Sequence, residues 1–200
     1  MVARMMETLE AKAPEGFFMT HTITGILYHR PASAVRGNAI LPLNCLRDLH
    51  PDLYELHTAK HAAAPAVLDQ VVAPLGCSWG DVVFFSPVHP RPLLAALRHS
   101  GRTVPEQEPW VLPAGRLDPD RTVIRLMRAG AAGHHADPPD ADDYLPFTTA
   151  SLRAVNRVTV QAVRRLRTLQ PDDPWLPWVD VPHVLYRGPV PLTWFDGRPT

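Results

Sequence analysis

The sequence predicts an α+β fold: a single domain that combines a mixed sheet with two to four helices. Short apolar runs bounded by glycine or proline indicate strands, and longer stretches with apolar residues at helical spacing indicate helices. These elements alternate irregularly, and the chain contains neither an internal repeat nor a linker that would divide it. With 46% apolar residues among 200, the chain can bury one sizeable core.

The first 64 residues predict a flexible arm, a short strand and a helix. Residues 1–20 have no sustained period, so we expect a flexible N-terminal arm there, followed by a single α+β domain over residues 21–200. Residues 26–28 indicate a short strand that stops before a proline. Because proline is preset for the first helical turn, Pro51 marks the start of a helix that should run to about residue 64.

From residue 81 onward, the chain predicts most of the sheet and the longest helix. Residues 81–86 (DVVFFS) form the clearest strand, and their unbroken apolar run is typical of a central strand buried on both faces. A leucine-rich helix should follow and end at Gly101. The last strand, 179–186, contains Pro182, which favours a sheet edge or a bulge. Two shorter strands and a long amphipathic helix are expected at 110–112, 122–127 and about 151–169.

Charge and cysteine content exclude several classes of protein. Twenty basic and 20 acidic residues give a formal net charge of zero, so no global charge attracts nucleic acid or a membrane. Two cysteines far apart make neither a disulfide framework nor a zinc knuckle, which is typical of a reduced, cytoplasmic protein. No apolar run approaches the roughly 18 residues of a membrane span, so we expect no membrane partner. The glycine motifs of phosphate and dinucleotide loops are absent.

The helix predicted from Pro51 carries three chemically capable side chains. Tyr54, His57 and His61 share one face of it, because they lie at positions i, i+3 and i+7. The two histidines could bind a transition metal through their imidazole nitrogens. A metal site needs a third ligand, however, and no HExxH motif is present. A polar helix face is the more ordinary interpretation, so we assign no metal site.

A second candidate site lies at the end of the first strand, where Tyr28, His29 and Arg30 follow one another. A histidine there could bind a sugar hydroxyl or exchange a proton, because its pKa lies near neutrality. Alternatively, it satisfies a backbone carbonyl. Asp81 and Asp180 lie next to apolar strands, where a buried carboxylate usually has an interaction partner or a functional role. Asp81 also suits a turn or cap after a glycine, and Asp180 also suits an ion pair with an arginine.

Arginines give the longest predicted helix a basic outer face. Arg153, Arg157 and Arg164 lie along it, and no acidic residue occurs between Ser151 and Gln170. Such a face would attract the phosphates of a nucleic acid. An ordinary solvated helix face has the same appearance.

The order of these motifs resembles the ADP-ribosyltransferase fold, and within it the DarT-type enzymes that modify nucleic acid with NAD. The similarity is carried by the strand ending in Tyr28 and His29, a turn at Gly37 before ILPLN, the DVVFFSPVHP strand and the late VPHVLYRG strand. The sequence is also similar to short uncharacterised bacterial proteins that share the YH…ILPLN opening. The resemblance implies that His29 helps to hold NAD.

The resemblance further implies a basic residue downstream and a glutamate near the last strand. Arg47 or Lys60 matches the first requirement, whereas the last strand offers Asp180 and no glutamate. In the leading hypothesis the cofactor is NAD or a related nucleotide, Tyr28 and His29 contact it, Tyr54 stacks on nicotinamide, and Asp180 stands for the acid. The alternatives are a non-enzymatic module that docks nucleic acid or an acidic protein, and a metal-binding protein.

Overall fold

The computed structural model describes residues 22–32, 34–62, 65–127, 139–170 and 181–197, with only the main chain of Lys60. The expected N-terminal arm lies outside these residues. The α-helices are α1 (Leu43–Leu49), α2 (Pro51–Thr58), α3 (Arg91–His99), α4 (Thr149–Val155) and α5 (Val160–Arg167). The strands are β1 (Ile26–His29), β2 (Ala39–Ile40), β3 (Val71–Val72), β4 (Cys77–Ser78), β5 (Val82–Phe85), β6 (Trp110–Pro113), β7 (Thr122–Arg125), β8 (Tyr144–Pro146), β9 (His183–Arg187) and β10 (Val190–Pro191).

These elements confirm the α+β class, but the expectation of a mixed sheet is wrong. The largest sheet has the strand order β5-β9-β7-β8, and all of its pairs are antiparallel. Two-stranded ladders join β1 to β6, β2 to β10 and β3 to β4, and these are antiparallel too. Parallel neighbours require a crossover connection, usually a helix packed on the sheet, and the described strands include no such pair.

The last strand occupies the centre of the sheet, not the edge that Pro182 had suggested. β9 lies between β5 and β7, while Pro182 precedes the first strand residue and removes no hydrogen bond from the ladder. β5 correspondingly lies at one end of the four-stranded order. An isolated bridge between Tyr28 and Ser86 continues from β5 to β1. This bridge explains why β5 is nearly as buried as a central strand.

Five α-helices occur in the described residues, one more than the upper expectation, because the helix predicted over 151–169 is two helices. α4 ends at Val155, and α5 starts anew after Thr159, whose hydroxyl accepts a hydrogen bond of 3.1 Å from the Ala162 amide. The helix that starts at Pro51 ends as α-helix at Thr58 and continues as a 3-10 turn to His61.

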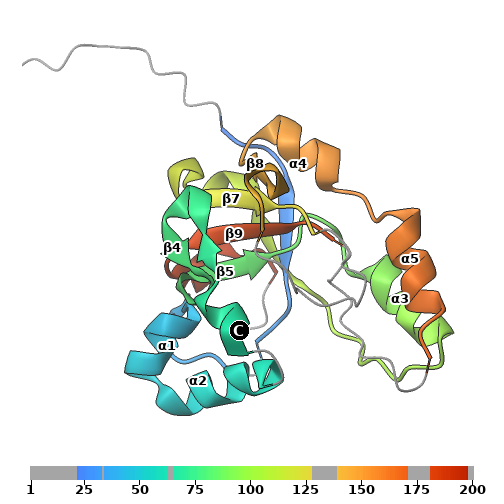
Figure 1. Cartoon of the computed structure of the whole chain (residues 1–200), viewed down its shortest axis with the longest axis horizontal. Helices are drawn as coiled ribbons and strands as arrows, with labels where there is room; N and C mark the ends of the chain where they lie inside the picture. The colour runs from blue at the N-terminus through green and yellow to red at the C-terminus, as the bar shows by residue number, and fades with distance from the viewer. Residues whose placement is uncertain (1–21, 33, 63–64, 128–138, 171–180, 198–200) are drawn as a thin grey trace, which may run out of the picture.

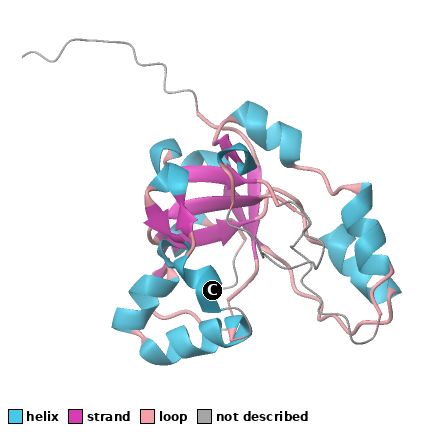
Figure 2. Ribbon diagram, in the orientation of Figure 1, coloured by secondary structure: helices cyan, strands magenta, loops and turns pink. Residues whose placement is uncertain are grey.

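The core lies between the sheet and the β1–β6 ladder, and Figures 1 and 2 show the helices arranged around it. Its largest cluster includes Leu27, Phe85, Leu112 and Ile124. α3 and α5 lie side by side and form a second cluster through their leucines. α1 and α2 pack on each other beyond β5 (Figure 1). The end of β1 and α3 line a common hollow, which Tyr28 and His29 enter from β1 and Leu94 from α3.

Candidate functional site

The ring of His29 lies in an aromatic cluster at the end of β1. His29 pairs with Trp110 across the β1–β6 ladder, and the two rings are stacked with centroids 6.0 Å apart. The rings of Phe85 and Phe195 approach the imidazole edge-on at 5.6 and 6.1 Å. Aromatic pairs at such distances hold a ring in a fixed orientation. The half-buried imidazole is thus positioned by three rings from distant parts of the chain.

Beside this cluster lies a small hollow with mostly apolar walls. Tyr28 and His29 line it from β1 and Arg30 from just after the strand, and Leu94 of α3 and Val104 also line it. The Tyr28 ring meets the ring of His89 edge-on, with centroids 4.7 Å apart. The small hollow has a volume of about 70 Å³, which suits a ring or a few atoms and not a whole nucleotide.

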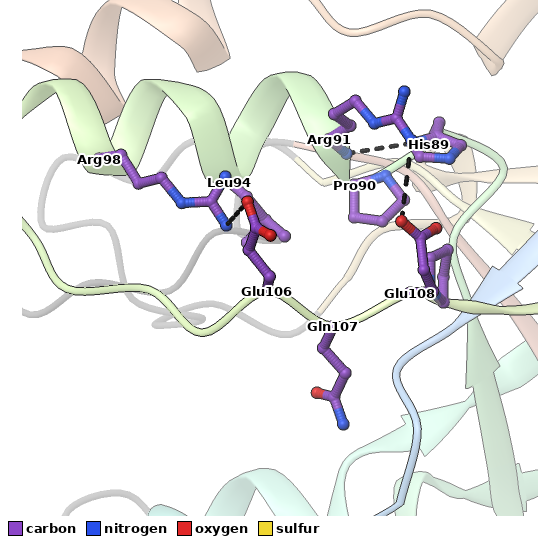
Figure 3. A pocket seen from close by; sticks show the side chains of 9 residues that line it. His89, Pro90, Arg91, Leu94, Arg98, Glu106, Gln107 and Glu108 are labelled. Carbon is purple, nitrogen blue, oxygen red and sulfur yellow. Dashed lines mark hydrogen bonds and ion pairs between the residues drawn. The ribbon is translucent and has the colours of Figure 1, made fainter.

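A larger hollow of about 290 Å³ adjoins the first one, between α3 and the segment 106–109 (Figure 3). The two share Pro90, Leu94, Gln107 and Pro109, and together we call them the β1–α3 cleft. Binding sites for small molecules usually measure about 300–1,000 Å³. The cleft reaches the lower end of this range.

Charged side chains from the two walls meet across the larger hollow. Arg91 and Glu108 are 3.8 Å apart, and Arg98 and Glu106 are 4.0 Å apart (Figure 3). All four side chains are more than a third exposed, so each pair contributes little to stability. The Arg91 amide donates a hydrogen bond of 3.1 Å to His89 Nδ1. Burial and the charge of Arg91 lower the pKa of His89, against a weaker opposing effect of Glu108.

The structure brings only some of the predicted site residues together. Tyr28 and His29 line the β1–α3 cleft, whereas Tyr54 on α2 and Arg47 on α1 are not among the residues that line either hollow. Arg47 lies 3.7 Å from the carboxylate of its neighbour Asp48. The side chain of Lys60 and all of Asp180 lie outside the described residues.

The other predicted sites also have definite places. His57 ends α2 and His61 lies in the following 3-10 turn, and no group of three or more metal-ligating side chains occurs in the described part of the chain. Arg153 on α4, Arg157 in the link and Arg164 on α5 are all exposed. None of these three arginines forms an ion pair within the described ranges.

Asp81 is a structural residue, as the cap interpretation predicted. Its carboxylate accepts hydrogen bonds from Asn44 Nδ2 at 2.7 Å, from the Ser78 amide at 2.9 Å and from the Ser78 hydroxyl at 2.7 Å. These bonds close a capping box around the 3-10 turn Trp79–Asp81 and tie it to α1. Burial alone would raise the pKa of Asp81, but the hydrogen bonds and the charge of Arg187 lower it overall.

Sequence reasoning missed the arginines of the larger hollow. Arg91 and Arg98 lie seven residues apart, which is two turns on one face of the leucine-rich helix, and this spacing was readable from the sequence. The glutamates that face them come from the segment after the helix, which carries no helix or strand. Their pairing depends on how this segment folds back along α3, and no local pattern indicates that.

Comparison with family models, with curated proteins and with solved structures finds no match to this chain. No helix among the described residues combines the length and apolarity that crossing a membrane would require.

Proposed function

We propose that this chain is an ADP-ribosyltransferase-like domain that binds NAD or a related nucleotide in the β1–α3 cleft. One observation carries the proposal: the cleft is lined by a fixed imidazole at one end and by two arginines at the other. A dinucleotide has the matching order of groups, with a flat ring and its ribose at one end and a pyrophosphate beyond them.

The small hollow is the proposed place of the nicotinamide end. Its walls are apolar side chains and prolines, which suit a flat ring, and the tyrosine and histidine of β1 supply polar atoms at its rim. In the proposed complex His29 hydrogen-bonds the ribose, and Tyr28 contacts the ring. The aromatic cluster keeps the imidazole in place without the ligand, so little ordering is needed on binding.

The larger hollow is the proposed place of the pyrophosphate. Guanidinium groups bind phosphate through paired N–H donors, and Arg91 and Arg98 present two of them on one wall. Their present partners are exposed carboxylates at the long end of ion-pair distances, so a phosphate would displace these carboxylates at small cost. These arginines replace Arg47 and Lys60 in the hypothesis drawn from the sequence.

The family resemblance also implies an acid that orients the ribose. The described acids that line the cleft are Glu106 and Glu108, and Glu108 lies next to Pro109, which is shared with the small hollow. We assign this role to Glu108. Glu108→Gln should then reduce transfer of ADP-ribose to an acceptor and leave NAD affinity nearly unchanged, as measured with labelled NAD and by calorimetry.

Thermal unfolding with added NAD tests the binding step. A ligand that binds only the folded state at 100 times its Kd stabilises the protein by about 2.7 kcal/mol, which raises the melting temperature by several degrees. His29→Gln should remove this rise. His99→Gln is the matched control, because His99 is an exposed residue at the end of α3 and lines neither hollow. No rise in the parent protein, or an equal rise in His29→Gln, contradicts the proposal.

The second candidate function is docking of a nucleic acid. Arg153, Arg157 and Arg164 favour it, because they are exposed and free of ion pairs among the described residues. Each phosphate contact contributes about 0.9 to the salt dependence of log K for duplex DNA. Replacing all three with glutamine should therefore lower that slope by about 3 if each contacts a phosphate. Arg116→Gln, on an exposed 3-10 turn, is the control.

A further inference from the structure

A row of polar side chains crosses the sheet at one register. Arg125 of β7 pairs directly with Tyr144 of β8 on one side and with His183 of β9 on the other. Residues directly opposite each other lie on the same face of a sheet. Ile124, the neighbour of Arg125, faces the other way into the core cluster that contains Phe85. Because the Phe85 ring contacts His29, this row and the β1–α3 cleft lie on opposite faces.

Arg125 is a buried charge with no hydrogen-bond or ion-pair partner among the residues that the structure describes. Only 5% of the residue is exposed. Within the described part of the chain, its guanidinium donates no hydrogen bond and forms no ion pair. A buried charge normally has a partner, since an uncompensated one costs several kcal/mol. Burial lowers the pKa of Arg125, while the charges of Tyr144 and Asp143 oppose this effect.

The hydroxyl of Tyr144, next to Arg125, is also unsatisfied. Its oxygen is buried and has no hydrogen-bond partner in the structure. A buried tyrosine hydroxyl usually finds one. Burial, the largest influence, raises the pKa of Tyr144, so the phenol keeps its proton at neutral pH and can donate it in a hydrogen bond.

Trp79 contacts the guanidinium of Arg125. The guanidinium carbon lies 5.1 Å from the centre of the indole ring, which is a cation–π contact. Such a contact uses the face of the indole ring and none of the N–H donors, which lie in the plane of the guanidinium. A planar acceptor with two oxygens is the natural complement to these donors.

We propose that Arg125 and Tyr144 form a binding site for the carboxylate group of a small molecule. The guanidinium binds both carboxylate oxygens, and the Tyr144 hydroxyl donates to one of them. A carboxylate carries one negative charge and neutralises the one guanidinium. A doubly charged phosphate would leave excess negative charge in a buried site that already lies near Asp143.

Titration of the full-length protein with sodium acetate, against sodium chloride at equal ionic strength, tests the site. We expect a saturable rise in melting temperature together with shifts of the Arg125 Nε–H and Trp79 indole N–H signals in NMR spectra. Arg125→Met should abolish both effects. Tyr144→Phe should weaken acetate binding by about tenfold, as expected for the loss of a hydrogen bond to a charged group. Arg116→Met is the matched control and should bind as the parent does.

Three outcomes overturn the proposal. One is an absence of saturation or of signal shifts with acetate in the parent protein. Another is equal acetate binding by Tyr144→Phe, which also decides the matter if Arg125→Met fails to fold. The third is stronger stabilisation by inorganic phosphate than by acetate at equal ionic strength, which rejects the carboxylate as the ligand. NAD binding in the β1–α3 cleft is measured separately, so either proposal can fail alone.

Discussion

Asp81 and Arg125 are charged residues of the same small protein, yet the fold treats them in opposite ways. The Asp81 carboxylate accepts three hydrogen bonds from Asn44 and Ser78, although it is only partly buried. Arg125 is 5% exposed as a residue, and its guanidinium has a cation–π contact with Trp79 but donates no hydrogen bond to the described residues. A charged group that exchanges its bound water for hydrogen bonds from the protein, as Asp81 does, stabilises the fold. A buried guanidinium that finds no hydrogen-bond acceptor among the described residues is the place where we propose that a ligand binds.

The contrast is sharpest in the effect of removing each charge, and Asp81→Ala should have the larger effect. It leaves Asn44 and Ser78 without their acceptor and separates the 3-10 turn from α1. Hydrogen bonds to charged groups contribute about 1.5–3 kcal/mol each, and partial exposure reduces this, so we expect a loss of about 2–3 kcal/mol in the free energy of unfolding. Denaturant unfolding measures it, with Asp69→Ala at an exposed position as the control. A loss below about 0.5 kcal/mol would contradict the structural role of Asp81.

The pH dependence of stability should report the same network. The folded-state pKa of Asp81 is lower than its ordinary value of 3.8, so its contribution is complete above that value and is lost as pH falls through the folded-state pKa. We expect the parent protein to lose more stability between pH 5 and the acid limit than Asn44→Ala does. Urea unfolding at several pH values checks this, and parallel curves for the two proteins would contradict it.

Arg125→Met should have a small effect in the absence of a ligand. Replacing an unpaired buried charge with an apolar side chain of similar length removes a desolvation cost, so the free energy of unfolding should stay within about 1 kcal/mol of the parent or increase. The measurement is denaturant unfolding in chloride buffer. A loss comparable with that of Asp81→Ala would show that Arg125 stabilises the fold as Asp81 does, and the contrast between the two residues would then be wrong.

The ion pairs of the β1–α3 cleft should contribute least. A double-mutant cycle with Arg98→Gln and Glu106→Gln should give a coupling energy below about 0.5 kcal/mol, because the glutamate is 93% exposed and the pair is 4.0 Å apart. A coupling above about 1 kcal/mol would mean that the pair closes the cleft firmly and competes with any phosphate.

Strands were the most predictable part of the fold. The sequences ILYH and VVFF are short apolar runs that end at or near proline, and β1 and β5 lie where these runs predicted. Their pairing was not predictable, because β5 lies beside β9 through contacts that span about a hundred residues. The break between α4 and α5 had a readable signal in Thr159, a good N-cap, but the apolar period continues across it.

The candidate site was predictable only in part. His29 stood out because a histidine ended an apolar strand, but its ring partners come from three separate elements. Tyr54 shares a helix face with two histidines, and that local regularity carries no information about which cleft the face meets. Arg125 had a signal that was not used: a single charge inside the run TVIRLM, at a register where the rest of the strand is buried.

The central position of β9 has a consequence for how the protein is made. β5 and β7 both pair with β9, and residues 183–187 are synthesised after every other strand of that sheet. Until they leave the ribosome, β5 and β7 each have an open edge where β9 will pair, which is the condition in which nascent chains associate wrongly. The ribosome-bound intermediate should therefore depend on chaperones until residues 183–187 emerge.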